Sequence, residues 1–206
     1  MVGLTLKDSP WGPAGWAAAK LWLFGLPVLW HLLVDRQRLS ISPARQGGFG
    51  VAVLTGTLAA AGIASGYLLI GHRVIEAALI RKTLEPIGLT RPQTYIALSV
   101  YWIVINSVLE EYVFRWFIMR KCERLIGPAA AIAASAAIFV VHHSIAMAAY
   151  FPWWINLLAS AAIFTAGAVW SWLYVRYRSI WVPYISHAIA DVAIFALGGW
   201  LIFGRT

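Results

Sequence analysis

Long apolar stretches alternate with short polar segments along most of the chain. A helix that crosses the hydrocarbon core of a bilayer needs about twenty mostly apolar residues. The apolar runs are continuous rather than alternating at every second position, which favours spanning helices over a transmembrane β-barrel. We therefore expect spanning helices at residues 14–34, 49–70, 93–119, 128–149, 154–175 and 180–203.

One segment between the second and third helices has a different pattern. Residues 72–92 alternate loosely between apolar and charged side chains, and Pro86 and Gly88 end the alternation. An amphipathic segment of this kind is typical of a helix that lies in the membrane interface. The predicted fold is all-α: a polytopic bundle of about six spanning helices with one short interfacial helix. No repeat or domain boundary is evident, so residues 1–206 are predicted to form a single integral membrane domain.

Composition and charge agree with a membrane protein. The 206 residues are 61% hydrophobic and 12% charged, whereas a soluble domain has about 25% charged residues. The net charge of +8 does not indicate nucleic acid, because Lys and Arg fall mainly in short loops, where they set topology and meet anionic lipid. Basic residues follow the first, third and fifth helices, so we expect those loops to be cytoplasmic.

Three ionisable residues, Glu110, Glu111 and Arg115, lie within the third predicted helix. A charge at the centre of a spanning helix costs about 2.5–3.5 kcal/mol on insertion scales and usually serves a function. Glu111 and Arg115 are four positions apart and can pair on one helix face. Glu110 points about 100° away from Glu111, so its partner must come from elsewhere. The structural alternative is an ion pair that orients helices, with Glu110 at the membrane edge.

Two other predicted helices carry a histidine four positions from a second notable side chain. His143 follows Phe139, and His187 precedes Asp191, so each pair shares a helix face. Either pair alone is explained by ordinary packing or by a local hydrogen bond. Together, polar groups in an apolar bundle are driven toward one another or toward water. His142 points to another face and is given no role.

Carboxylates and imidazoles in an apolar shell have a definite chemistry. A carboxylate and an imidazole around one water can act as general base and then as general acid, while a second imidazole can hydrogen-bond a developing oxyanion. We infer attack of water on an acyl group without a covalent intermediate. A nucleophilic hydrolase is less supported, because Cys122 lies in a charged loop and no Gly-x-Ser-x-Gly elbow occurs. The hydroxyls of Ser107 and Ser135 lie within helices, where hydroxyls commonly bond to backbone carbonyls.

The order of these motifs resembles the CPBP family of intramembrane proteases, also called the CAAX-protease and bacteriocin-processing, or Abi, family. That family has Glu-Glu-x-x-x-Arg, Phe-x-x-x-His and His-x-x-x-Asn/Asp on successive hydrophobic helices. The corresponding residues here are 110–115, 139–143 and 187–191, and the protease-like core is expected at about 93–203. Each motif alone is weak, but three in order within apolar helices are specific.

The resemblance implies a glutamic-type intramembrane endopeptidase. Such an enzyme would hydrolyse a peptide bond of a membrane-associated or C-terminally tagged substrate. By the same resemblance, Glu110 activates water with help from His143, and His187 and Asp191 stabilise the oxyanion. The supporting residues would be Glu111, Arg115 and Phe139.

One position departs from the best-known CAAX-cleaving members, which have Asn where this chain has Asp191. An amide can donate a hydrogen bond, whereas an ionised carboxylate can only accept one. Asp191 must therefore be protonated or must orient His187 instead. We favour the second role.

The expected partners are membrane lipid and a membrane-associated protein or peptide substrate, with no nucleic acid and no cofactor. The small size and short loops favour a bacterial member in the inner (plasma) membrane. Two alternatives stay open. One is a zinc-dependent version of the same protease, with Glu110, His143 and His187 as ligands. The other is a non-catalytic immunity or scaffold protein that binds a partner through the same cavity.

Overall fold

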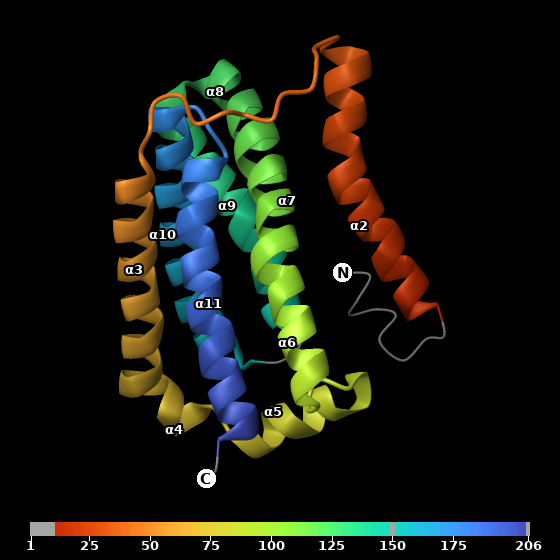
Figure 1. Ribbon diagram of the computed structural model, residues 1–206, viewed down its shortest axis with the longest axis vertical. Helices are drawn as coiled ribbons and strands as arrows, with labels where there is room; N and C mark the ends of the chain where they lie inside the picture. The colour runs from red at the N-terminus through yellow and green to blue at the C-terminus, as the bar shows by residue number, and fades with distance from the viewer. Residues whose placement is uncertain (1–10, 149–150, 205–206) are drawn as a thin grey trace. The chain divides into compact units, whose positions relative to one another are not determined.

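The computed structural model describes residues 11–148 and 151–204, and every regular element among them is a helix (Figure 1). The predicted all-α architecture is therefore confirmed. Within these described residues, six helical segments are long and apolar enough to cross a membrane: Ala17–Val34, Phe49–Val74, Pro92–Ile126, Pro128–Met147, Trp153–Tyr177 and Trp181–Phe203. They match the six predicted spans closely, although Ala149, the predicted end of the fourth span, lies outside the described residues.

The third spanning helix is longer than predicted. We expected it to end at Met119, but helix continues to Ile126. No glycine or proline stands between these positions, and Gly127, at φ +76°, is the residue that ends the helix. The basic residues assigned above to a loop instead form its last turns, where cations interact favourably with the negative end of the helix dipole.

The chain divides into two compact units, Met1–Gln46 with Leu109–Ile180, and Gly47–Val108 with Trp181–Thr206. The division falls within the third spanning helix, in α7 (Ser107–Glu111), so that helix contributes residues to each unit. The expectation of a single domain stays a prediction.

The described helices of the first unit are α2 (Gly12–Leu29) with a π-helical continuation Trp30–Val34, the π-helical segment Tyr112–Met119, α8 (Arg120–Ile126), α9 (Pro128–Met147) and α10 (Trp153–Tyr177). α9 packs along α10. At the centre of this unit the ring of Phe139 lies edge-on to the rings of Phe114 and Trp170, at 4.9 and 5.8 Å between centroids. All three rings are buried, so Phe139, the first residue of the second motif, belongs to the hydrophobic core of this unit.

An ion pair joins the ends of the first and third spanning helices within this unit. Lys121 Nζ donates to both carboxylate oxygens of Asp35, and this bond holds the pKa of Asp35 below its ordinary value. A carboxyl group whose pKa is lowered by folding stabilises the folded state above its unfolded pKa of about 3.9. That contribution is lost as the pH falls through the lower folded pKa.

Asp35→Asn is therefore expected to flatten the acid side of the stability profile. The melting temperature of the wild-type protein in detergent should fall as the pH is lowered from about 5. The melting temperature of the variant should fall less over the same pH range. The measurement is the melting temperature at stepped pH values. Glu85→Gln is the control, because the Glu85 carboxylate forms no ion pair in the described part of the chain. Equal acid slopes for wild type and Asp35→Asn would contradict the argument.

The described helices of the second unit are α3 (Phe49–Gly66) with a π-helical continuation Tyr67–Gly71, α4 (His72–Val74), α5 (Ala77–Leu84) with a 3₁₀ turn Glu85–Ile87, α6 (Pro92–Val100), the π-helical segment Tyr101–Asn106 and α11 (Trp181–Phe203). Within the predicted amphipathic segment, α5 is the expected short helix. Its place at a membrane interface stays a prediction.

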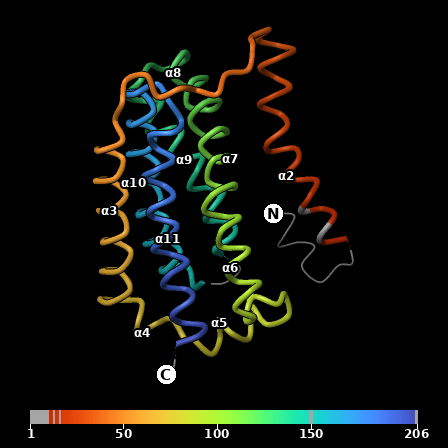
Figure 2. Tube along the Cα trace, in the orientation of Figure 1, coloured from red at the N-terminus to blue at the C-terminus, as the bar shows by residue number. Residues whose placement is uncertain are grey.

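α3 and α11 lie side by side in the second unit (Figure 2). Thr55 Oγ1 donates to Ser186 Oγ at 3.0 Å, one turn from Ala52, which is fully buried. A Cβ atom added at Gly56 would lie 2.9 Å from both the Cβ of Ile189 and the carbonyl oxygen of Ser186. A glycine at this point therefore permits the close approach that small residues give membrane helices.

Gly56→Ala should therefore destabilise the protein by about 1–3 kcal/mol, the usual cost of overpacking. Gly62→Ala on the same helix is the matched control, because a Cβ there meets nothing within 4 Å. Alanine favours a helix over glycine by about 1 kcal/mol, so the control should be neutral or slightly stabilising. Reversible unfolding in mixed detergent micelles measures both variants, and equal stabilities would refute the close contact.

Candidate active site

The first two sequence motifs lie together in the first unit. Glu110 and Glu111 stand on α7, Arg115 on the π-helical segment that follows it, and Phe139 and His143 on α9. The third motif, with His187 and Asp191 on α11, belongs to the second unit.

Arg115 and Glu111 form a fully buried ion pair. Their side chains are both 0% exposed, and Arg115 Nε lies 3.3 Å from Glu111 Oε2, so the pairing predicted from their four-residue spacing is confirmed. The guanidinium also donates from Nη2 to the carbonyl oxygen of Gly167 at 3.4 Å. Its carbon lies 4.7 Å from the ring centroid of Phe139 and 5.3 Å from that of Trp170. Aromatic faces attract a desolvated cation, so the arginine is held by charge, hydrogen bond and ring faces together.

The helix around this pair is widened. Residues Tyr112–Met119 are π-helical, and such segments often occur at functional sites. Ser135 on α9 donates to the carbonyl oxygen of Phe114 at 2.9 Å. The prediction that Ser135 bonds to a backbone carbonyl is confirmed, although the carbonyl belongs to a different helix. This bond ties the widened segment to α9.

His143 is held in one tautomer by its own helix. Its Nδ1 lies 3.0 Å from the carbonyl oxygen of Phe139, four residues earlier. A carbonyl oxygen only accepts, so Nδ1 carries the hydrogen, and in the neutral ring Nε2 is left as the acceptor. The Phe139 ring also packs 4.3 Å from the imidazole. The four-residue spacing of the motif therefore does more than place two side chains on one face, because it leaves a basic nitrogen pointing away from the backbone.

Glu110 is buried, with 5% of its surface exposed. It interacts electrostatically with Lys20 of α2 and with His142 of α9. The rings of His142 and His143 lie edge-on, 5.2 Å apart, so the carboxylate and both histidines belong to one polar cluster of the first unit.

Sequence reasoning missed two members of this cluster. His142 was given no role because it does not share the face of Phe139 and His143, yet it interacts with Glu110. Lys20 was not included among the candidate residues. A lysine within an apolar span was the available signal, since such a charge is costly unless it snorkels or finds a partner.

Asp191 lies between a serine and a histidine in the second unit. Its Oδ2 is 3.6 Å from His187 Nε2 and 2.5 Å from Ser107 Oγ. Ser107 Oγ also donates to the carbonyl oxygen of Trp102 at 2.8 Å, which confirms that this hydroxyl bonds to a backbone carbonyl. A hydroxyl has one hydrogen to donate. Ser107 therefore shares its single hydrogen between the Asp191 carboxyl group and the carbonyl oxygen of Trp102.

Comparison with known protein families gives one match. A family model described as type II CAAX prenyl endopeptidase, Rce1-like, matches residues 92–193. Within the described residues, the matched segment contains all three motifs, the three spans Pro92–Ile126, Pro128–Met147 and Trp153–Tyr177, and the first part of the span Trp181–Phe203. No curated protein and no solved structure matches the chain.

Proposed function

The chain belongs to the CPBP, or CAAX-protease, family of membrane endopeptidases, and from this premise we propose that Glu110 and His143 activate a water molecule for peptide-bond hydrolysis. The family and the six apolar spans of the described residues make the chain an integral membrane protein of a protease class. The observation that supports the mechanism best is that one unit holds both the buried Glu110 carboxylate and an imidazole of fixed tautomer, that of His143.

The proposed step begins with water held between Glu110 and His143. Glu110 takes a proton from the water while the water oxygen bonds to the carbonyl carbon of the substrate. His143 Nε2 accepts a hydrogen bond from the same water and so aligns it. The carbon–nitrogen bond then breaks, and the proton passes from Glu110 to the leaving amine. Lys20 and His142 interact with Glu110 and are proposed to hold its carboxylate in place.

The buried ion pair has a positioning role in this proposal. Arg115 stacks on Phe139, and the carbonyl and ring of Phe139 contact His143. Glu111 holds Arg115 at 3.3 Å. These three supporting residues thus form a continuous set of contacts that ends at the imidazole.

For the third motif, we keep oxyanion stabilisation by His187 as the proposed role. The 3.6 Å separation between Asp191 Oδ2 and His187 Nε2 supports Asp191 as the residue that orients the ring. The contact of Ser107 with the same oxygen adds a positioning residue that the family motif does not include.

The hydrogen-bond inventory around Ser107 leads to a prediction for position 191. Asp191→Asn supplies an amide that donates to Ser107 Oγ while Ser107 donates to Trp102, so the cleavage rate should stay within about tenfold of wild type. Asp191→Leu removes the carboxyl group that contacts Ser107 Oγ and lies near His187 Nε2, a loss that costs about 1–3 kcal/mol, and its rate should fall a further ten- to hundredfold. The measurement is kcat/KM on one cleaved peptide. Equal rates for the two variants would show that position 191 does not orient His187.

The proposed function is tested by product analysis with wild-type protein in liposomes. The substrates are peptides with and without a prenylated cysteine near the C-terminus, incubated in ¹⁸O water with hydroxylamine present. Direct attack by water predicts one ¹⁸O atom in the new carboxylate and no hydroxamate. A hydroxamate product would indicate an acyl-enzyme and overturn the mechanism.

The same sample separates the proposal from its alternatives. Loss of cleavage with a chelator, together with stoichiometric zinc in the purified protein, would replace the glutamic mechanism by a zinc-dependent one. Capture of a membrane protein without cleavage of it or of any peptide would favour the immunity or scaffold interpretation. Cleavage only of the prenylated peptides would define the substrate as lipid-modified. We propose that the protein itself lies in the bacterial inner membrane.

A further inference from the structure

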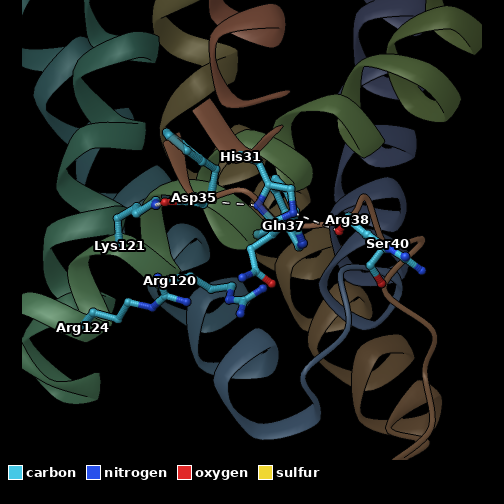
Figure 3. Close-up of a pocket in the computed structure, with 10 residues that line it drawn as sticks. His31, Asp35, Gln37, Arg38, Ser40, Arg120, Lys121 and Arg124 are labelled. Atoms are coloured by element: carbon cyan, nitrogen blue, oxygen red, sulfur yellow. Dashed lines mark hydrogen bonds and ion pairs between the residues drawn. The ribbon is translucent and has the colours of Figure 1, made fainter. Parts of the chain in front are cut away.

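A cavity of about 200 Å³ lies in the first unit, at the end of the first and third spanning helices (Figure 3). The first helix and the polar segment after it form one wall, and the last turns of the third helix form the other. Liquid water takes about 30 Å³ per molecule, so the space suits a small polar group rather than a folded peptide. The cavity does not include the proposed catalytic residues.

The walls of this cavity are strongly basic. Four cationic side chains, Arg38, Arg120, Lys121 and Arg124, line it together with the single carboxylate of Asp35. Lys121 is paired with Asp35. In the described part of the chain, neither Arg38 nor Arg124 takes part in an ion pair, so the cavity has a surplus of positive charge that a bound anion would balance.

The basic segment is held in place by its own contacts. His31 Nε2 donates to the carbonyl oxygen of Arg38 at 3.0 Å, because a carbonyl can only accept. The His31 ring packs edge-on against Trp116 at 4.4 Å. The backbone that carries Arg38 is therefore anchored to the third spanning helix, and the cationic wall is preorganised rather than a chance grouping of loop side chains.

The cavity also lies beside bare apolar surface. The first span ends at Val34 and the third at Ile126, so we expect the cavity to lie near the level where a bilayer changes from hydrocarbon to headgroups. Leu33 and Leu125, near these ends, are 70% and 83% exposed. A ligand with an anionic head and apolar tails would match both surfaces, whereas a soluble anion would use only the first.

From the basic cavity and its apolar border, we propose that this site binds the phosphate headgroup of an anionic phospholipid. The arginine guanidinium groups would donate forked hydrogen bonds to phosphate oxygens, with the acyl chains along the exposed leucines. Basic pockets between spanning helices bind anionic headgroups in this way. The proposal does not rest on the proposed protease function.

The test is native mass spectrometry of delipidated full-length protein in detergent, titrated with phosphatidylglycerol or phosphatidylcholine. Wild type should retain phosphatidylglycerol in preference to phosphatidylcholine. The double variant Arg38→Gln/Arg124→Gln should bind phosphatidylglycerol about 25- to 30-fold more weakly, since each basic group near an anionic surface contributes about a fivefold factor. Arg36→Gln/Arg45→Gln removes the same charge from residues outside the cavity lining and should bind as wild type does.

Further measurements distinguish a bound lipid from a free anion, and the loss of the site from a folding defect. Arg38→Lys/Arg124→Lys keeps the charge and should keep the preference for phosphatidylglycerol. Equal weakening by the two glutamine pairs, or equal binding of the two lipids by wild type, would overturn the site. Displacement of phosphatidylglycerol by an equal concentration of inorganic phosphate would assign the cavity to a free anion and overturn the lipid proposal.

Discussion

Glu110→Gln is expected to lower kcat/KM for peptide cleavage by about 10²–10⁴, the usual contribution of a general base. Glutamine has nearly the same shape as glutamate, but its amide cannot take a proton from water. The Glu111–Arg115 pair and the Phe139 ring cluster are made by other side chains of the first unit. The variant should therefore insert and fold while losing cleavage, as measured in liposomes on a peptide that wild type cuts.

Two controls make the Glu110 result specific. Glu85→Gln changes an exposed carboxylate of the 3₁₀ turn after α5 and should cleave at the wild-type rate. The melting temperature of Glu110→Gln should stay near wild type, which separates lost chemistry from lost structure. Cleavage by Glu110→Gln within a few-fold of wild type would remove Glu110 from the role of base. That outcome would leave the lipid site unaffected.

Arg115→Met is expected to destabilise the protein by about 3–5 kcal/mol. The substitution removes the cation that lies 3.3 Å from Glu111 at a site with no exposure, and removing one member of a buried pair is the costly way to break it. The double variant Glu111→Gln/Arg115→Met removes both charges and should recover most of the loss, because replacing a whole buried pair by less polar groups is often neutral. Denaturant unfolding in micelles gives the three free energies of the cycle.

A second ion pair of the same unit serves as the control for Arg115. Arg178 donates to both oxygens of Glu123 at 2.7 and 2.8 Å, but its side chain is 49% exposed. Exposed pairs contribute about 0–1 kcal/mol, so Arg178→Gln should cost far less than Arg115→Met. Similar costs for the two substitutions would mean that burial does not set the energy of the Arg115 pair. If the double variant folds but cleaves slowly, the pair also positions His143.

The spanning helices and one local ion pair could be predicted from sequence because both depend on short-range pattern. Twenty apolar positions in a row are needed for a span wherever it lies, and residues four apart on a helix face each other without help from the rest of the fold. The predicted end of the third helix, Met119, was too early, since the helix continues to Ile126. The reason is that basic residues suit both a loop and the C-terminal end of a helix.

The partners of the predicted residues could not be found in the same way. Lys20 is 90 positions before Glu110, and Ser107 is 84 positions before Asp191. Pairing over such separations is decided by how helices rotate and pack, which a hydrophobic pattern fixes only to within a broad face. The π-helical turn at residues 112–119 adds to the difficulty, since it changes the angle at which later side chains leave the helix. The pairing of Glu111 with Arg115 was thus predictable from the chain, whereas the more distant neighbours of the motif residues were not.

The Phe139 side chain has a consequence for how this protein can change. Its ring touches the Arg115 cation on one side and the His143 imidazole on the other. Residues that share a partner in this way do not respond independently to substitution, and their coupling energies are typically about 0.5–3 kcal/mol. A replacement tolerated at 115 in one sequence background can therefore be harmful in another, depending on what stands at 139. Evolution of the first two motifs is expected to proceed through compensating pairs of changes, with the ring at 139 setting which pairs are accessible.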